Sequence, residues 1–149
     1  TIWIPCSAMY PNTTSGCAPL AQVELSNGPE IKVLDFDASS DENAQFSVAF
    51  PKSWNEGTLT FQAFFTVTGT DSGTVAWGLS AVAIADNDSC NTDLNISAES
   101  ATFEVAGSPG VDELVFFQVM RDVSADDQTG DARLLGIKLF FTTDAKNDA

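Results

Sequence analysis

Carboxylates are the side chains of this chain best suited to chemistry, because its 149 residues include no histidine. A glycosidase needs two carboxyl groups, and Asp35 or Asp37 together with Glu42 could supply them. All three lie in the polar run 35–42, for which a solvated loop is the simpler interpretation. The lack of histidine also removes Ser-His-Asp catalysis and the commonest transition-metal ligand, so we expect no enzyme.

Two acidic loops, residues 86–89 and 126–131, gather the oxygen ligands that calcium prefers. Neither has EF-hand spacing, and solvated acidic loops are the alternative interpretation. The sequence contains no GxxxxGK[ST] or GxGxxG motif, and its three cysteines form no CxxC pair. We therefore expect no cofactor.

The charge balance restricts the partners. Six basic and twenty-one acidic residues give a formal net charge of −15, which repels phosphate backbones and anionic lipid. The longest mainly apolar stretches are shorter than the ~20 residues that cross a membrane as a helix. We expect neither nucleic acid nor membrane as a partner.

The chain has three cysteines, so it can form at most one disulfide and would then keep one free thiol. Cys6 and Cys17 are close enough in sequence to be joined across a turn. Assembly in a reducing cytosol favours free thiols, and cysteine is also a common small core residue. We expect Cys6 and Cys17 to be unbonded.

The strongest structural signal is alternation of apolar and polar residues with a period of two. It covers residues 44–50 and 59–68 and predicts half-buried strands there. The Gly- and Asp-containing run 70–73 favours a tight hairpin between 59–68 and 74–84. Further strands are expected at 21–26, 31–36, 101–105, 114–121 and 134–142.

This pattern predicts an all-β fold, an antiparallel β-sandwich of jelly-roll type with about eight strands. Residues 21–143 form the expected β domain, residues 1–20 an extended N-terminal arm, and residues 144–149 a flexible C-terminal tail. The arm carries Trp3, Ile4, Met9 and Tyr10 among prolines and turn residues. It either packs on its own domain or docks on a neighbouring subunit, where these residues would form an interface.

Other surface residues have two interpretations each. Arg121 and Arg133 lie at expected strand ends near Asp122 and Asp131, and form either internal charge pairs or salt bridges between subunits. Tyr10 and Trp54 could stack on sugar rings if exposed. Trp77 is weaker for this role, because it alternates with Leu79 and is typical of a core residue.

Several sequence blocks resemble a known family. They are residues 3–9, 34–37, 44–54, 117–123 and 132–138, in this order and spacing along nearly the whole chain. The chain resembles the small jelly-roll virion structural proteins of tailed bacteriophages.

This resemblance implies a protein of the particle exterior, made in the host cytoplasm and without catalytic residues. It implies a capsid decoration or cement protein that stabilises the head by binding the major capsid protein or another virion protein. The alternative is the knob of a head or tail fibre that binds host-surface carbohydrate. A homotrimer is expected, because three-fold points recur on icosahedral shells.

Overall fold

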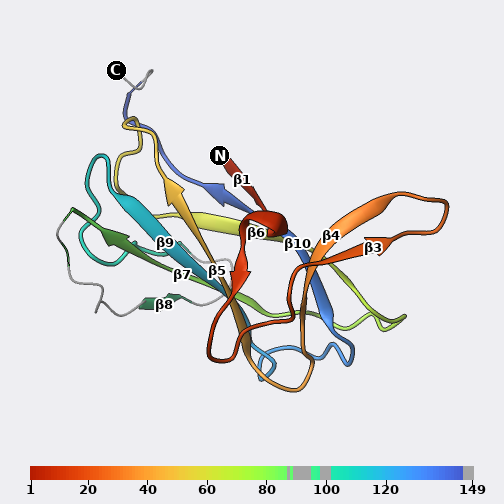
Figure 1. The fold of residues 1–149 in the computed structure, drawn as a ribbon. Coiled ribbons are helices and arrows are strands. Elements are labelled where there is room, and N and C mark those ends of the chain that lie inside the picture. The colour runs from red at the N-terminus through yellow and green to blue at the C-terminus, as the bar shows by residue number, and fades with distance from the viewer. Residues whose placement is uncertain (87, 89–94, 98–101, 146–149) are drawn as a thin grey trace.

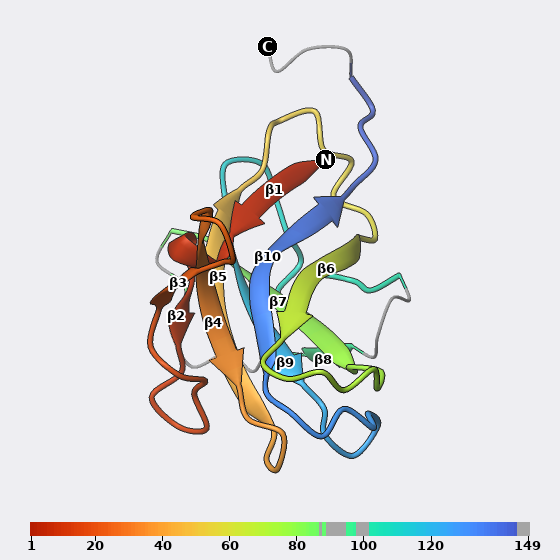
Figure 2. The same cartoon turned by 90° about the vertical axis from the view of Figure 1, so that its right-hand side faces the viewer.

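The computed structural model describes residues 1–86, 88, 95–97 and 102–145. Two antiparallel sheets face each other in a β-sandwich (Figures 1 and 2). The described strands are β1 (Ile2–Pro5), β2 (Tyr10–Pro11), β3 (Ala21–Glu24), β4 (Glu30–Phe36), β5 (Glu42–Ala49), β6 (Thr60–Val67), β7 (Trp77–Ile84), β8 (Asn95–Ser97), β9 (Leu114–Arg121) and β10 (Ala132–Phe140). A short 3-10 helix, η1 (Cys6–Ala8), follows β1.

Each sheet has five strands. Sheet A has the order β1-β10-β4-β3, with β6 along the other edge of β10. Sheet B has the order β2-β5-β9-β7-β8. The prediction of an all-β, antiparallel fold is therefore confirmed. No helix in the described part of the chain is long and apolar enough to cross a membrane.

Alternation along the strands builds the core between the sheets. On β9, Val115, Phe117 and Val119 are buried, and Phe117 stacks on Phe46 of β5 with ring centroids 4.9 Å apart. Sheet A contributes buried residues such as Ile137 and Leu139 of β10. The expected strands over 44–50 and 114–121 correspond closely to β5 and β9.

The predicted hairpin between 59–68 and 74–84 is wrong. β6 pairs with β10 in sheet A, whereas β7 pairs with β9 and β8 in sheet B. β7 is buried at seven of its eight positions, as is typical of a strand covered on both faces. The turn-forming residues 70–73 lie instead in a crossover from one sheet to the other.

Two aspartates, one in this crossover and one in the loop that precedes β10, bind the two segments together. The Asp71 carboxylate accepts hydrogen bonds from the N–H and hydroxyl of Thr129, both at 2.8 Å. Asp127 accepts bonds from the N–H and hydroxyl of Thr74, at 2.5 and 2.8 Å. These bonds favour the charged carboxylates and lower the pKa of Asp71 and Asp127 below the ordinary 3.8.

Replacing Asp127 with Asn should destabilise the protein in a pH-dependent way. Because its folded pKa is lowered, the Asp127 carboxylate contributes stability above pH 3.8, and this contribution disappears as the pH falls through the folded pKa. Urea unfolding at pH 7 should show Asp127→Asn less stable than wild type, and the gap should close as the pH falls below 3.8 through the lowered folded pKa of Asp127. Asp112→Asn is the control, since Asp112 is exposed and makes no hydrogen bond to the described residues. A gap that does not change with pH would contradict the role of the charge.

The first twenty residues are not a separate arm, so the domain boundary expected at residue 20 is wrong. β1 pairs with β10, and β2 pairs with β5. Ile4 and Met9 are each only 6% exposed and belong to the core. The segment is irregular in sequence because it supplies one short strand to each sheet, and η1 lies between the two strands.

The C-terminal end is described as far as residue 145. Asp144 donates its backbone N–H to the carbonyl of Ser53 at 3.0 Å, so the chain is held against 53–55 at the start of the expected tail. The rest of the expected tail, 146–149, lies outside the described residues.

Candidate functional site

Arg121 is an internal residue, which corrects its expected place at an interface. It ends β9 on the inward-facing side, and its residue exposure is 0%. Its guanidinium binds Asp126, with Nε 2.7 Å from Oδ2, and also donates to the carbonyls of Phe36, Gly130 and Gln128. Arg121 therefore joins β4, β9 and the loop before β10 from within.

Arg133 also forms an internal pair, but nearer the surface. Its Nε lies 3.1 Å from Oδ1 of Asp35, across the paired strands β10 and β4. The two side chains are 26% and 23% exposed. Both arginines fit the alternative of internal charge pairs, although their partners are not the sequence neighbours Asp122 and Asp131.

The carboxylates considered for catalysis act within the fold. Asp35 pairs with Arg133, Glu42 accepts the N–H of Asp37 at 2.8 Å, and Asp37 accepts the N–H of Ser39 at 2.6 Å. No three acidic or cysteine side chains of the described residues converge as a metal site. In the loop 126–131, one of the two loops considered for calcium, the Asp126 carboxylate pairs with Arg121 and the Asp127 carboxylate accepts a hydrogen bond from Thr74.

Cys6 and Cys17 are buried free thiols. The Cys6 thiol donates to the carbonyl of Lys32 at 3.0 Å, and burial raises the pKa of Cys17 to about 12. Both side chains fill the core beneath the N-terminal segment, so neither is a reactive nucleophile at neutral pH. Cys90 lies outside the described residues.

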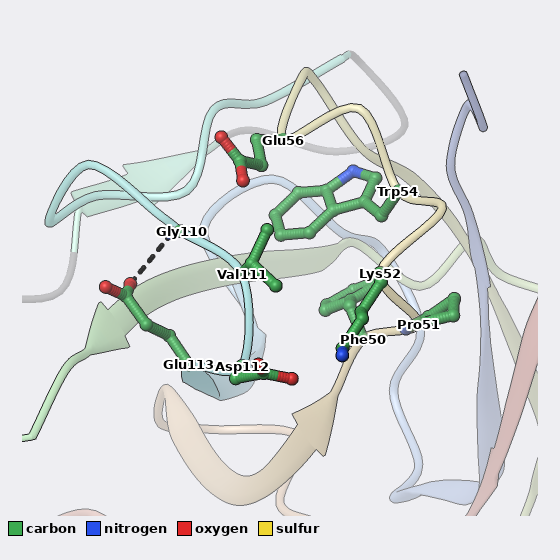
Figure 3. Close-up of a pocket in the computed structure, with 9 residues that line it drawn as sticks. All are labelled: Phe50, Pro51, Lys52, Trp54, Glu56, Gly110, Val111, Asp112 and Glu113. Carbon is green, nitrogen blue, oxygen red and sulfur yellow. Dashed lines mark hydrogen bonds between the residues drawn. The ribbon is translucent and has the colours of Figure 1, made fainter. Parts of the chain in front are cut away.

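Trp54 is buried, with 5% of its surface exposed, so it cannot serve as the expected sugar-stacking platform. Its ring packs on Phe50 at 4.3 Å. Figure 3 shows the indole lining a small cavity beside Val111. The cavity has a volume of about 10 Å³, enough for about one water molecule. Trp77 is likewise 5% exposed and is a core residue.

One broad surface of this acidic molecule carries no charged side chain. On β5 and β9, the residues that point away from the core face the same side and pair across the strands. We call these positions the β5–β9 outer face. Its members are Asn43, Gln45, Ser47, Ala49, Leu114, Phe116, Gln118 and Met120.

No member of the β5–β9 outer face is charged. Leu114 is 39% exposed, Ser47 and Ala49 are exposed, and Phe116 is partly exposed. By contrast, sheet A carries charged residues, including Arg133 and Lys138. Large uncharged areas on a strongly charged protein mark surfaces that contact other molecules.

An amide network occupies one end of this face. Gln118 Oε1 accepts hydrogen bonds from Asn12 Nδ2 at 2.7 Å and Gln45 Nε2 at 3.2 Å, and Gln118 Nε2 donates to Asn43 Oδ1 at 3.0 Å. Tyr10 pairs with Gln45 in the adjacent strand β2 and is 49% exposed. The network fixes four amide groups beside one exposed aromatic ring.

The residues of the N-terminal segment that were expected at one interface lie in different parts of the fold. Tyr10 lies at the edge of sheet B, and Trp3, 50% exposed, lies on sheet A opposite Lys138. Ile4 and Met9 are in the core, which corrects their expected interface role.

The sequence analysis did not predict the β5–β9 outer face. Residues 114–121 have apolar side chains at both odd and even positions, and this pattern could have indicated that both faces of the strand make contacts.

No family model matches the sequence, and no curated protein matches it either. The resemblance to virion proteins therefore remains an expectation. The protein belongs to the all-β class, as a sandwich of two antiparallel sheets.

Proposed function

We propose that this protein is a structural component of a bacteriophage particle exterior, a capsid decoration or cement protein. The β5–β9 outer face is the surface that binds the major capsid protein or another virion protein. The observation that carries this proposal is the absence of charge from that face on a chain of net charge −15.

Electrostatics and apolar burial favour the same surface. Acidic copies crowded on a shell repel one another, and salt screens that repulsion over about 8 Å at physiological ionic strength. Contact through an uncharged face costs no desolvation of ions, and it gains roughly 25 cal/mol per Å² of apolar surface buried. Leu114 and Phe116 supply the apolar area, and the amides at the other end supply hydrogen bonds.

The topology supports a jelly roll as the finer description of the sandwich. From β4 to β7 the chain changes sheet at every strand, β7, β8 and β9 all lie in sheet B, and β10 returns to sheet A. Phe103, between β8 and β9, bridges to Leu59 just before β6, so it occupies the place of a fourth strand beside β6. With this short piece the arrangement has the eight strands of two interlocked Greek keys.

Replacing Ser47 with Lys tests the binding face directly. Ser47 is exposed and lies beside Phe116 in the strand register, so the fold should tolerate the lysine. We expect it to weaken binding to heads of the phage that encodes the chain by about 100-fold, because it would place an unpaired charge in a dry contact. Co-sedimentation with purified heads measures this effect.

Ser7→Lys is the matched control, since Ser7 is exposed on η1 and lies off the face. It adds the same charge and should leave head binding unchanged. Equal binding by both variants, or no binding by the wild-type protein to heads that lack it, would contradict the proposal.

A carbohydrate-binding fibre knob is the second candidate, because Tyr10 lies beside the amide network. An exposed aromatic ring with fixed amide groups is a common arrangement for stacking on a sugar and bonding its hydroxyls. A glycan array separates the two functions. Saturable binding that is lost in Tyr10→Ala would favour the knob, and head binding without glycan binding would favour the decoration protein.

A further inference from the structure

Trp3 is an exposed aromatic residue on the outer face of sheet A. Its side chain is 50% exposed, whereas the other two tryptophans, Trp54 and Trp77, are each 5% exposed. The next residue of β1, Ile4, is buried in the core, so Trp3 points to the outside of the sandwich. Tryptophan is enriched where proteins contact other molecules, because it combines a large apolar ring with a polar N–H group.

The Trp3 ring is held in place on the sheet. A Cβ atom at Gly136 would lie 2.4 Å from Cη2 and 2.6 Å from Cζ2 of Trp3, so the indole occupies the space that a larger residue there would need. Phe64, which pairs with Gly136 in the strand register, packs edge to face against the indole at 5.2 Å. A ring that is already fixed loses little side-chain entropy when a ligand stacks on it.

Polar side chains lie beside the Trp3 ring. In the strand register Trp3, Lys138 and Gln62 form one row across β1, β10 and β6, which lie side by side in Figure 2. Paired residues of antiparallel strands share a face, so all three side chains are on the outside of sheet A. Gln62 is exposed, and the Lys138 ammonium lies over the Phe140 ring, 5.2 Å from its centroid. An aromatic ring, an amide and an ammonium group are thus presented together.

Charge selects among the ligands that stack on an aromatic ring, which are nucleic-acid bases, cations and sugar rings. The net charge of −15 repels nucleic acid and polyanionic saccharides. Lys138 repels a cationic ligand, and no acidic residue stands in its row to attract one. A neutral ligand with an apolar face and several hydroxyl groups fits what remains.

We propose that the outer face of sheet A binds a neutral pyranose oligosaccharide, with one sugar ring stacked on Trp3. Gln62 and Lys138 bond the hydroxyls of the same ring and of the next one. Neighbouring strands are about 4.8 Å apart, so Gln62 lies roughly 10 Å from Trp3 across β10. A disaccharide spans that distance and a single sugar ring does not, so the site should prefer oligosaccharides to monosaccharides.

This site is separate from both surfaces of the proposed functions. The β5–β9 outer face belongs to sheet B, and Tyr10 lies at the edge of sheet B, whereas Trp3 is on the opposite sheet. A sandwich that contacts a shell through the β5–β9 outer face would present sheet A to the surroundings. Sugar binding by the isolated protein does not depend on that orientation, so it can fail or succeed independently of head binding.

Tryptophan fluorescence tests the site on the intact chain, because Trp3 is the exposed tryptophan and Trp54 and Trp77 are shielded. The protein is titrated with cellohexaose, maltohexaose and mannohexaose. At least one should protect Trp3 from acrylamide quenching, with a dissociation constant of about 1 mM or lower, and should bind more tightly than its monosaccharide. Hexagalacturonate, the anionic comparison, should not bind. No protection by any neutral hexasaccharide up to about 10 mM, or tighter binding of hexagalacturonate, would overturn the proposal.

Substitutions assign the binding to sheet A, with calorimetry as the readout and circular dichroism to check the fold. Trp3→Ala should weaken hexasaccharide binding by at least about 10-fold. Gln62→Ala changes an exposed side chain and should weaken it by about two- to tenfold, through loss of a hydrogen bond. Tyr10→Ala is the matched control, since Tyr10 is 49% exposed but lies on sheet B, and it should bind as wild type. Unchanged binding by Trp3→Ala and Gln62→Ala, or loss of binding in Tyr10→Ala, would overturn the assignment.

Discussion

Arg121→Ala should cost about 3–5 kcal/mol of the free energy of unfolding, because it leaves the Asp126 carboxylate buried without its partner. It also removes the donor to three backbone carbonyls, those of Phe36, Gly130 and Gln128. Net stabilities of about 5–15 kcal/mol are usual, so the loss is a large share of the total. Guanidinium unfolding measures it.

Arg133→Ala is the matched control. The Arg133–Asp35 pair is partly exposed, and pairs of that kind contribute at most about 1 kcal/mol. The variant should unfold close to the wild-type midpoint. Equal losses for Arg121→Ala and Arg133→Ala would show that the burial of Arg121 does not determine its contribution.

Removal of residues 1–11 should destabilise the β domain by more than about 4 kcal/mol. The deletion uncovers the core around Ile4, Cys6 and Met9, and burial of a large apolar side chain contributes about 1.5–3 kcal/mol. It also removes β1 and β2 and their ladders to β10 and β5. Thermal and denaturant unfolding should show a lower midpoint or no cooperative transition.

Trp3→Ala is the comparison for this deletion, since Trp3 belongs to the same segment but is half exposed. Its effect should be much smaller than that of the deletion. A shortened chain that unfolds at the wild-type midpoint would restore the idea of a detachable arm.

Local patterns in the sequence were sufficient to predict individual strands. Residues 44–50 alternate strictly, and the structure has β5 there. The all-β class follows from the same alternation and from the turn residues between strands. Strand pairing was less accessible, because β6 and β10 lie about seventy residues apart and nothing local selects one over the other.

The candidate surfaces depended on that long-range pairing. The sequence identified Gln45 and Gln118 only as polar positions on separate strands, and the register places them side by side. Arg121 was considered beside Asp122, whereas its partner is Asp126, because the loop after β9 turns back over the strand end. The partners of charged and amide groups are fixed by tertiary contacts, which composition and periodicity do not encode.

A cryo-electron microscopy map of the phage particle tests the proposed function most directly. The proposal predicts density for this sandwich on the particle exterior, with the β5–β9 outer face, including Phe116 and Gln118, buried against a virion protein. Density with that face toward solvent, or its absence from the particle, would contradict the assignment of this protein as a structural component bound through an uncharged sheet.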